Sequence, residues 1–188
     1  MRVVSGQYGG RNLKAVPGTN TRPTTDKIKE SLFNIIGPYF DGGRILDMYA
    51  GSGAIAVEAV SRGMDEALLF ERNRQAIETI KQNLAMTKEE EKFTLMTGDA
   101  RKLVKMHQQD IKENPFSLVF LDPPYKAQEV EKDIQTLVEL DLLTNQAIIV
   151  AEIDKSDHLA EEISRMEQYR RVEYGMTALV FYQWKEQD

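Results

Sequence analysis

Apolar and polar residues follow two alternating patterns along most of the chain. Short runs of consecutive apolar residues, typical of strands buried on both faces, are separated by segments with apolar residues at helical spacing. The expected strands cover 44–49, 67–71, 93–97, 117–121 and 146–152. The expected helices between them cover 54–62, 73–86, 99–112 and 127–140. This alternation predicts an α/β fold, in which helices cover both faces of a mostly parallel sheet.

The two ends of the chain differ from this pattern. The first residues predict a hairpin around Gly9-Gly10, and a helix then begins at Thr25 or Asp26 and stops at Gly37-Pro38. After the fifth strand we expect a helix over 157–167 and two antiparallel strands, 169–174 and 179–184. The prediction is one domain over 1–188, with an N-terminal hairpin extension over 1–24 and a Rossmann-like core over 25–188. Its sheet is seven-stranded and mostly parallel, with an antiparallel C-terminal strand.

The end of the first core strand carries a candidate ligand loop. Ile45-Leu46-Asp47 is followed by a turn with two glycines, Gly51 and Gly53, before the next helix begins. Glycine permits a backbone with positive φ and a close approach to a ligand. The N–H groups at the start of the helix point toward whatever lies beyond the strand. The alternative reading is an ordinary strand-to-helix turn.

Further carboxylates follow the next two strands. Glu71 ends the second strand, where nucleoside-binding folds place an acceptor for ribose hydroxyls, and Asp99 follows the third strand. The third glycine of the dinucleotide fingerprint is missing, and Asp47 precedes the glycines, where it suits an ammonium group. We therefore expect S-adenosylmethionine rather than a dinucleotide. The expected cofactor-binding residues are Asp47, Tyr49, Ala50, Gly51, Ser52, Gly53, Glu71, Arg72, Asp99 and Ala100.

The fourth core strand ends in the tetrapeptide Asp122-Pro123-Pro124-Tyr125. A carboxylate and a proline carbonyl can accept both hydrogens of an exocyclic amine, and tyrosine offers a face on which a base stacks. Because the carboxyl ends of parallel strands meet at one edge, this tetrapeptide and the glycine loop are expected at one site. The predicted chemistry is methyl transfer to a base nitrogen, with Asp122 stabilising the charge that develops there.

Composition and charge limit the other possibilities. The 188 residues suffice for one full core, and the absence of cysteine excludes disulfides and thiolate metal sites. No metal site is expected, because His107 and His158 are isolated. The net charge is −6, yet residues 1–30 carry six cations and two acids. This basic end suggests a local contact with a polyanion. No membrane segment or secretory signal is evident, so the expected location is the cytoplasm.

The chain resembles the RsmD family of S-adenosylmethionine-dependent methyltransferases over essentially its whole length. The resemblance lies in residues 3–13, in Arg22-Pro23-Thr24-Thr25-Asp26, in residues 29–34, in residues 46–53 and in the Asp122–Tyr125 tetrapeptide. It implies a class I methyltransferase fold and methylation of the N2 amine of a guanine in 16S ribosomal RNA. Asp122, Pro123, Pro124 and Tyr125 would then form the catalytic loop. Arg11, Lys14 and Arg22 are the expected contacts to ribosomal RNA or to an assembling small subunit.

Three other functions fit part of the pattern. The same tetrapeptide would serve a DNA adenine-N6 or cytosine-N4 methyltransferase, although 188 residues leave little room for a base-reading domain. A dinucleotide-dependent oxidoreductase shares the strand-loop-helix unit but needs the third glycine. A non-catalytic RNA-binding module would retain only the basic N-terminal end.

Overall fold

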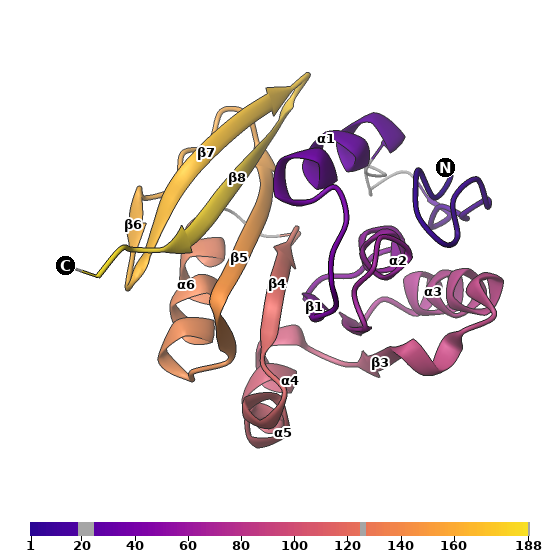
Figure 1. Ribbon diagram of the computed structural model, residues 1–188, viewed down its shortest axis with the longest axis horizontal. Helices are drawn as coiled ribbons and strands as arrows, with labels where there is room; N and C mark the ends of the chain where they lie inside the picture. Colours follow the sequence, from indigo (N-terminus) through magenta and orange to yellow (C-terminus); the bar gives the residue numbers. More distant parts are fainter. Residues whose placement is uncertain (19–24, 125–126, 188) are drawn as a thin grey trace.

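The computed structural model describes residues 1–18, 25–124 and 127–187, which form one central sheet between two layers of helices (Figure 1). The helices are α1 (Asp26–Ile36), α2 (Ala54–Ser61), α3 (Arg74–Thr87), α4 (Ala100–Met106), α5 (Gln108–Glu113) and α6 (Ala127–Glu139), with a 3-10 turn, η1 (Glu90–Lys92). The strands are β1 (Arg44–Asp47), β2 (Glu66–Glu71), β3 (Phe93–Thr97), β4 (Phe116–Leu121), β5 (Leu143–Asp154), β6 (Glu162–Ile163), β7 (Met166–Tyr174) and β8 (Thr177–Trp184). The predicted α/β class is confirmed.

The sheet reverses its strand order at the centre. Its order is β3-β2-β1-β4-β5-β8-β7-β6, with parallel pairing from β3 to β5 and antiparallel pairing beyond β5. The reversal lies between β1 and β4, which pair with each other while β2 lies on the other side of β1. Ligands of such sheets bind beyond the carboxyl ends of the strands at this point. The antiparallel part is larger than expected, since β6 raises the described sheet to eight strands instead of seven.

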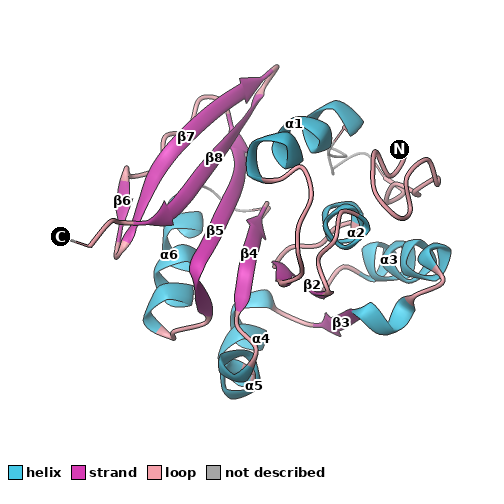
Figure 2. Ribbon diagram, viewed as in Figure 1, coloured by secondary structure: helices cyan, strands magenta, loops and turns pink. Residues whose placement is uncertain are grey.

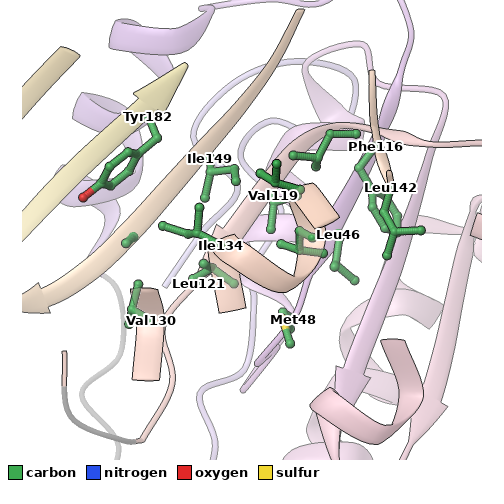
Figure 3. Close-up of a cluster of buried hydrophobic side chains, with 14 of the residues drawn as sticks. Leu46, Met48, Phe116, Val119, Leu121, Val130, Ile134, Leu142, Ile149 and Tyr182 are labelled. Carbon is green, nitrogen blue, oxygen red and sulfur yellow. The ribbon is translucent and has the colours of Figure 1, made fainter. Parts of the chain in front are cut away.

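Two apolar clusters hold the helix layers to the sheet. Figure 3 shows one of them, in which Leu46, Val119 and Ile149 from three adjacent strands meet Val130 and Ile134 from α6. The other cluster lies on the opposite face and joins the sheet to α1, α2, α3 and the N-terminal segment. Burial of each large apolar side chain contributes about 1.5–3 kcal/mol. Because both faces are covered, the central strands are apolar without alternation, which is the pattern read from the sequence.

The first helix begins where its cap residue predicts. Thr25 has an extended backbone, and its side-chain hydroxyl accepts a hydrogen bond from the Ile28 N–H at 3.2 Å. Leu32 and Phe33 are buried on its inner face, and the helix ends before Gly37. The predicted start and stop of this helix are therefore confirmed.

The predicted helix over 157–167 is wrong. Leu159, Ile163 and Met166 are buried at intervals of four and three residues, which mimics a helical face. Instead the chain turns at Ser164, whose φ is 55°, and Ile163 pairs with Met166 across an antiparallel hairpin. The edge of the long strand β8 offers β7 a full ladder of backbone hydrogen bonds, and this pairing overrides the local periodicity.

Two other boundaries differ from the prediction. The helix expected over 99–112 is divided into α4 and α5 at His107, which caps the end of the first piece. The strand expected over 146–152 is longer, because β5 continues to Leu143 past an irregularity in its pairing with β4. Neither change moves the strand ends that form the predicted site.

The N-terminal segment, residues 1–18, folds back on itself without forming regular strands (Figure 2). The Val3 N–H donates to the Arg11 carbonyl at 2.9 Å, and the Gly10 N–H donates to the Val3 carbonyl at 2.8 Å. A single antiparallel bridge joins Arg2 and Asn12. The expected hairpin thus takes the form of a compact turn with one bridge.

A buried carboxylate attaches this segment to the core. Glu58 of α2 is 0% exposed and accepts hydrogen bonds from the Val4 and Ser5 N–H groups at 2.8 and 3.1 Å. The Arg62 Nε donates to the same carboxylate at 2.9 Å, and the Lys29 Nζ lies 3.4 Å away. These charge-assisted contacts compensate the burial of the carboxylate. They fix the N-terminal segment against α1 and α2.

Within residues 1–18, 25–124 and 127–187, no helix has the length and apolar character needed to cross a lipid bilayer.

Candidate functional site

One cavity of about 980 Å³ lies at the carboxyl ends of the central strands. The loops after β1, β2, β3 and β4 line it, together with the end of β5 and residues 15–18 of the N-terminal segment. Gly51 and Asp122, which are 71 positions apart in the chain, both border this cavity. The strand reversal between β1 and β4 therefore brings the two predicted motifs to one place, as the sequence led us to expect.

The glycine loop has the backbone that only glycine adopts easily. Gly51 and Gly53 have φ values of 58° and 81°, and Gly53 is the N-cap of α2. A Cβ at Gly51 would have no neighbouring atom within 4 Å, whereas one at Gly53 would crowd Leu69 at 3.3 Å. The loop is therefore tight against the core at Gly53 and open at Gly51.

Glu71 organises the wall beside this loop. One of its carboxylate oxygens accepts the Gly51 N–H at 2.8 Å, and the other accepts the Arg72 and Asn73 N–H groups at 2.9 and 3.0 Å. These bonds hold the loop after β1 against the loop after β2. A carboxylate oxygen has two lone pairs, so Glu71 retains acceptor capacity toward the cavity that it lines.

Asp47 is the most unusual group at the site. It ends β1 and is 1% exposed, and neither carboxylate oxygen accepts a hydrogen bond of ordinary geometry from the described residues. Burial, followed by the nearby charge of Glu71, raises the pKa of Asp47 to about 7, and a weak contact with the Ala56 N–H lowers it in part. A buried carboxyl group with so little donation is costly and rare in folded proteins. Such a group suits a ligand that brings its own cation or N–H donors.

The third wall comes from the loop after β3. Asp99 caps α4 by accepting the Lys102 N–H at 3.1 Å, and its other oxygen lies 3.7 Å from the Arg72 Nη1. Ala100 follows it and is 9% exposed. Both line the cavity. The small side chain of Ala100 and the absence of a side chain at Gly98 leave room at this wall for a flat ligand.

A polar network fixes Tyr49 at the cavity. Its hydroxyl donates to Asp133 of α6 at 2.6 Å, and the Arg101 Nε donates to the other Asp133 oxygen at 2.8 Å. Arg101 also pairs with Glu129 at 2.6 Å. Burial raises the pKa values of Tyr49 and Asp133 above their ordinary values. The network joins the loop after β1 to α4 and to α6, the helix that follows the Asp122 loop.

The Asp122 loop faces the same space. Asp122, Pro123 and Pro124 line the cavity, while Tyr125 lies outside the described residues. Burial raises the pKa of Asp122 well above its ordinary value, with further contributions from Glu152 and Asp47. The side chains of Asp122 and Glu152 are hydrogen-bonded to each other.

Glu152 and Asn83 were not predicted at this site, and neither were Arg101 and Asp133 of the Tyr49 network. Glu152 follows the apolar run of β5 as Asp47 follows that of β1. This shared position at the end of a buried strand could have identified Glu152 from the sequence. Asn83 is 1% exposed on α3 and donates to the carbonyls of Ser52 and Lys14 at 2.8 and 3.0 Å. Nothing in its helical sequence marks it, because its partners come from distant loops. It ties the glycine loop to the N-terminal segment.

Arg11 and Lys14, two of the expected RNA contacts, are not among the described residues that line the cavity. The Arg11 guanidinium stacks over the Tyr8 ring at 5.3 Å and donates to the carbonyls of Met86 and Thr87 at 3.3 and 3.1 Å. Lys14 is exposed, and its backbone N–H donates to Asn83 at 2.8 Å. Arg22 lies outside the described residues. Arg11 is thus partly engaged in holding the N-terminal segment on α3.

Known proteins resemble the chain over its full length. A family model described as "Conserved hypothetical protein 95" matches residues 1–183. The chain is 43% identical to "Putative rRNA methyltransferase YlbH" of Bacillus subtilis, over 97% of this chain and 98% of that protein. It is 32% identical to the ribosomal RNA small subunit methyltransferase D of Escherichia coli K12, over 100% of this chain and 91% of that protein. A solved structure of a conserved hypothetical protein from Streptococcus pyogenes has a TM-score of 0.76 at 42% identity, covering 84% of this chain and 95% of that one.

Proposed function

The chain belongs to the conserved hypothetical protein 95 family, with full-length relatives among the ribosomal RNA small subunit methyltransferases D, and from this premise we propose that it methylates ribosomal RNA. The proposed reaction transfers a methyl group from S-adenosylmethionine to the exocyclic N2 amine of a guanine in 16S RNA. The observation that carries this proposal is the single cavity shared by Gly51, Asp47 and Asp122. Because the substrate is ribosomal RNA, we also propose that the protein acts in the cytoplasm.

The residues around the glycine loop fit S-adenosylmethionine. Asp47 supplies a buried carboxylate for the ammonium group of the methionine part, and the backbone of Gly51–Gly53 accommodates its chain. Glu71 accepts from the ribose hydroxyls, and Asp99 with Ala100 faces the adenine. When bound, S-adenosylmethionine supplies an electrophilic methyl group on a sulfonium. Tyr49, Ala50, Ser52 and Arg72 complete this wall of the cavity.

Asp122 and Pro123 act on the amine of the base. The nitrogen of an exocyclic amine is a weak nucleophile because its lone pair is delocalised into the ring. Two acceptors, the Asp122 carboxylate and the Pro123 carbonyl, orient the amine and stabilise the positive charge that grows on it. Pro124 keeps the backbone of the loop extended. That Tyr125 offers a face on which the base stacks stays a prediction from the sequence.

The N-terminal segment is the proposed contact to RNA. Lys14 is exposed beside residues 15–18, which border the cavity, and Arg11 retains an exposed surface next to it. Phosphate contacts from such cations position an RNA without reading its sequence. We add Arg22 to these proposed RNA contacts from its position in the sequence alone. A partly assembled small subunit is the proposed form of the substrate.

Methyl transfer to separated nucleic acids tests the proposal. The protein is incubated with methyl-labelled S-adenosylmethionine and with unmethylated 16S RNA, small subunits or DNA, and the labelled nucleoside is identified by mass spectrometry. We expect N2-methylguanosine, and a loss of at least 100-fold in the rate for Asp122→Asn, because the amide lacks the negative charge that stabilises the positive charge on the amine. Asp110→Asn makes the same chemical change on the exposed surface of α5, and we expect it to keep the wild-type rate.

Other outcomes would assign another function. Label in DNA adenine or cytosine would contradict the proposal and support the DNA methyltransferase reading, which the full-length rRNA methyltransferase relatives do not favour. Full activity of Asp122→Asn would remove Asp122 from the reaction. A protein that binds RNA but neither binds S-adenosylmethionine nor transfers label would be a binding module.

A further inference from the structure

Glu152 lines the cavity, but the proposed reaction gives it no role so far. It lies on β5, which runs parallel to β4 with Leu121 paired to Ala151. The next residue in each segment is an acid, Asp122 directly after β4 and Glu152 within β5. Both line the cavity. The register of two adjacent parallel strands therefore sets their carboxyl groups side by side.

The contact between these two groups requires a proton. Their side chains are hydrogen-bonded to each other. An ionised carboxylate can only accept hydrogen bonds, so two carboxyl groups can share one only when one of them is protonated. Two such groups in one site cannot both ionise at neutral pH without strong repulsion. The Asp122–Glu152 pair therefore holds one proton and one negative charge.

The surroundings of the pair favour this single charge. Burial, the charge and hydrogen bond of Glu152, and then the charge of Asp47 all raise the pKa of Asp122. β8 faces Glu152 with Leu179, and α6 lines the cavity with Val130. The other charged groups that line the cavity are Glu71, Arg72, Asp99, Arg101, Asp154 and Asp157. The two arginines among them are in ion pairs with Asp99, Glu129 and Asp133.

We propose that Glu152 is a positioning residue, whose carboxyl group shares one proton with Asp122 in a hydrogen bond and aims the other Asp122 oxygen at the amine of the base. This inference rests on the proposed function, since it assigns the second member of the same acceptor site. It also explains how Asp122, whose pKa is raised by acids on two sides, keeps a fixed orientation at the cavity.

The pair completes the proton balance of the reaction. The amine nitrogen forms a bond to the methyl carbon, the carbon–sulfur bond breaks, and its electron pair remains on sulfur. The nitrogen then carries one hydrogen too many. Asp122 accepts this proton, which leaves the pair doubly protonated and neutral until one proton passes to water at the cavity mouth. The proton shared by Asp122 and Glu152 stays within the pair throughout the bond-forming step.

Two variants and a pH series test the role of Glu152. Single-turnover methyl transfer is measured from pH 6 to pH 9 for the wild type, Glu152→Gln and Glu152→Ala. Glutamine can still donate to Asp122, so its rate at pH 7 should be within about threefold of the wild type, while alanine should lower the rate at least tenfold. The ratio of the Glu152→Gln rate to the wild-type rate should rise at least threefold toward pH 9, because glutamine cannot lose the shared proton.

Asp157→Asn is the matched control, since it removes another negative charge that lines the cavity. Its rate relative to the wild type should not change with pH by more than about twofold. A pH-independent ratio for Glu152→Gln, a wild-type rate for Glu152→Ala, or a Glu152→Gln variant as slow as Glu152→Ala would each overturn the proposal.

A measurement without RNA separates this inference from the proposed function. Carbon-13 NMR of the side-chain carboxyl groups should show that one member of the pair titrates well above the ordinary range. In Glu152→Gln the remaining Asp122 signal should titrate at lower pH. If these shifts appear but no nucleic acid is methylated, the pair stands and the proposed function fails. If both carboxyl groups titrate in the ordinary range, the pair itself is refuted.

Discussion

Glu58 on α2 and Asp47 at the end of β1 are both buried carboxyl groups, but their surroundings are opposite. Glu58 receives two backbone N–H groups, the Arg62 guanidinium and the nearby Lys29 ammonium. Asp47 accepts no hydrogen bond of ordinary geometry from the described residues, although the Ala56 N–H lowers its pKa in part, and the charge of another acid, Glu71, raises that pKa. One carboxylate is fully compensated within the protein, and the other is not.

The difference separates a structural role from a functional one. A compensated carboxylate such as Glu58 fixes two segments to each other and leaves nothing for a ligand. An uncompensated one costs stability, and a fold retains such a cost mainly where a ligand later removes it. Asp122 and Glu152 are an intermediate case, since they compensate each other through one proton. Asp47, Asp122 and Glu152 thus differ from Glu58 in their partners rather than in their chemistry.

The largest expected effect concerns the compensated carboxylate. Glu58→Gln removes the counter-charge of Arg62, which is 3% exposed, and leaves Lys29, which is 0% exposed, paired only with Asp26 at 3.7 Å. Breaking a buried ion pair in this way costs about 3–5 kcal/mol of the free energy of unfolding. Urea unfolding followed by circular dichroism measures the loss.

A matched surface pair calibrates this result. Glu78→Gln removes an acid from an ion pair on α3 whose two side chains are 65% and 62% exposed. Its effect should stay within about 0.5 kcal/mol. A loss below about 1 kcal/mol for Glu58→Gln would show that the buried network does not hold the N-terminal segment. Glu58 would then not be the structural counterpart of Asp47.

The next effect concerns the uncompensated carboxylate and depends on pH. The pKa of Asp47 is raised to about 7 in the folded protein, above its ordinary value of 3.8 in the unfolded chain. The unfolded chain therefore loses this proton first, and the wild type loses stability as pH rises from about 4 to 7. Asp47→Asn has no such proton, so its stability relative to the wild type should rise over this range by up to about 4 kcal/mol.

Unfolding curves of both proteins at pH 4, 5.5, 7 and 8 provide this difference, in which the other titrating groups cancel. Asp110→Asn, an exposed acid on α5, serves as the reference and should show no trend with pH. A flat difference for Asp47→Asn would mean that Asp47 has its ordinary pKa and is compensated by groups or water beyond the protein contacts described above.

The sequence was sufficient for the parts of the fold that follow local rules. Continuous apolar runs identified β1 to β5, and the residues at the ends of β1, β2 and β4 gave Asp47, Glu71 and Asp122 their places. Because ligands bind where the strand order of such a sheet reverses, the same pattern predicted a shared site for Gly51 and Asp122. The exact functional roles of these residues stay predictions.

Contacts between distant segments could not be predicted from the sequence. The apolar residues of β6 and of the start of β7 have helical spacing. They form strands because β7 pairs with the edge of β8 and β6 pairs with β7. Asn83, Glu58 and Glu152 have the appearance of ordinary polar residues of helices and a strand. Lys14 lies 69 positions from Asn83 and Ser5 lies 53 positions from Glu58, and the partner of Glu152 follows a neighbouring strand. Their importance is created by the tertiary structure.

The central claim is that Asp47 is kept uncompensated for a cationic ligand group, and proton release on ligand binding tests it most directly. S-adenosylhomocysteine, which retains the ammonium group, is bound at saturating concentration at pH 7 in buffers of different ionisation enthalpy, and calorimetry counts the protons. With its pKa at about 7, Asp47 is about half protonated, so the wild type should release ~0.5 proton per site and Asp47→Asn nearly none. Equal proton release by the two proteins would contradict the account.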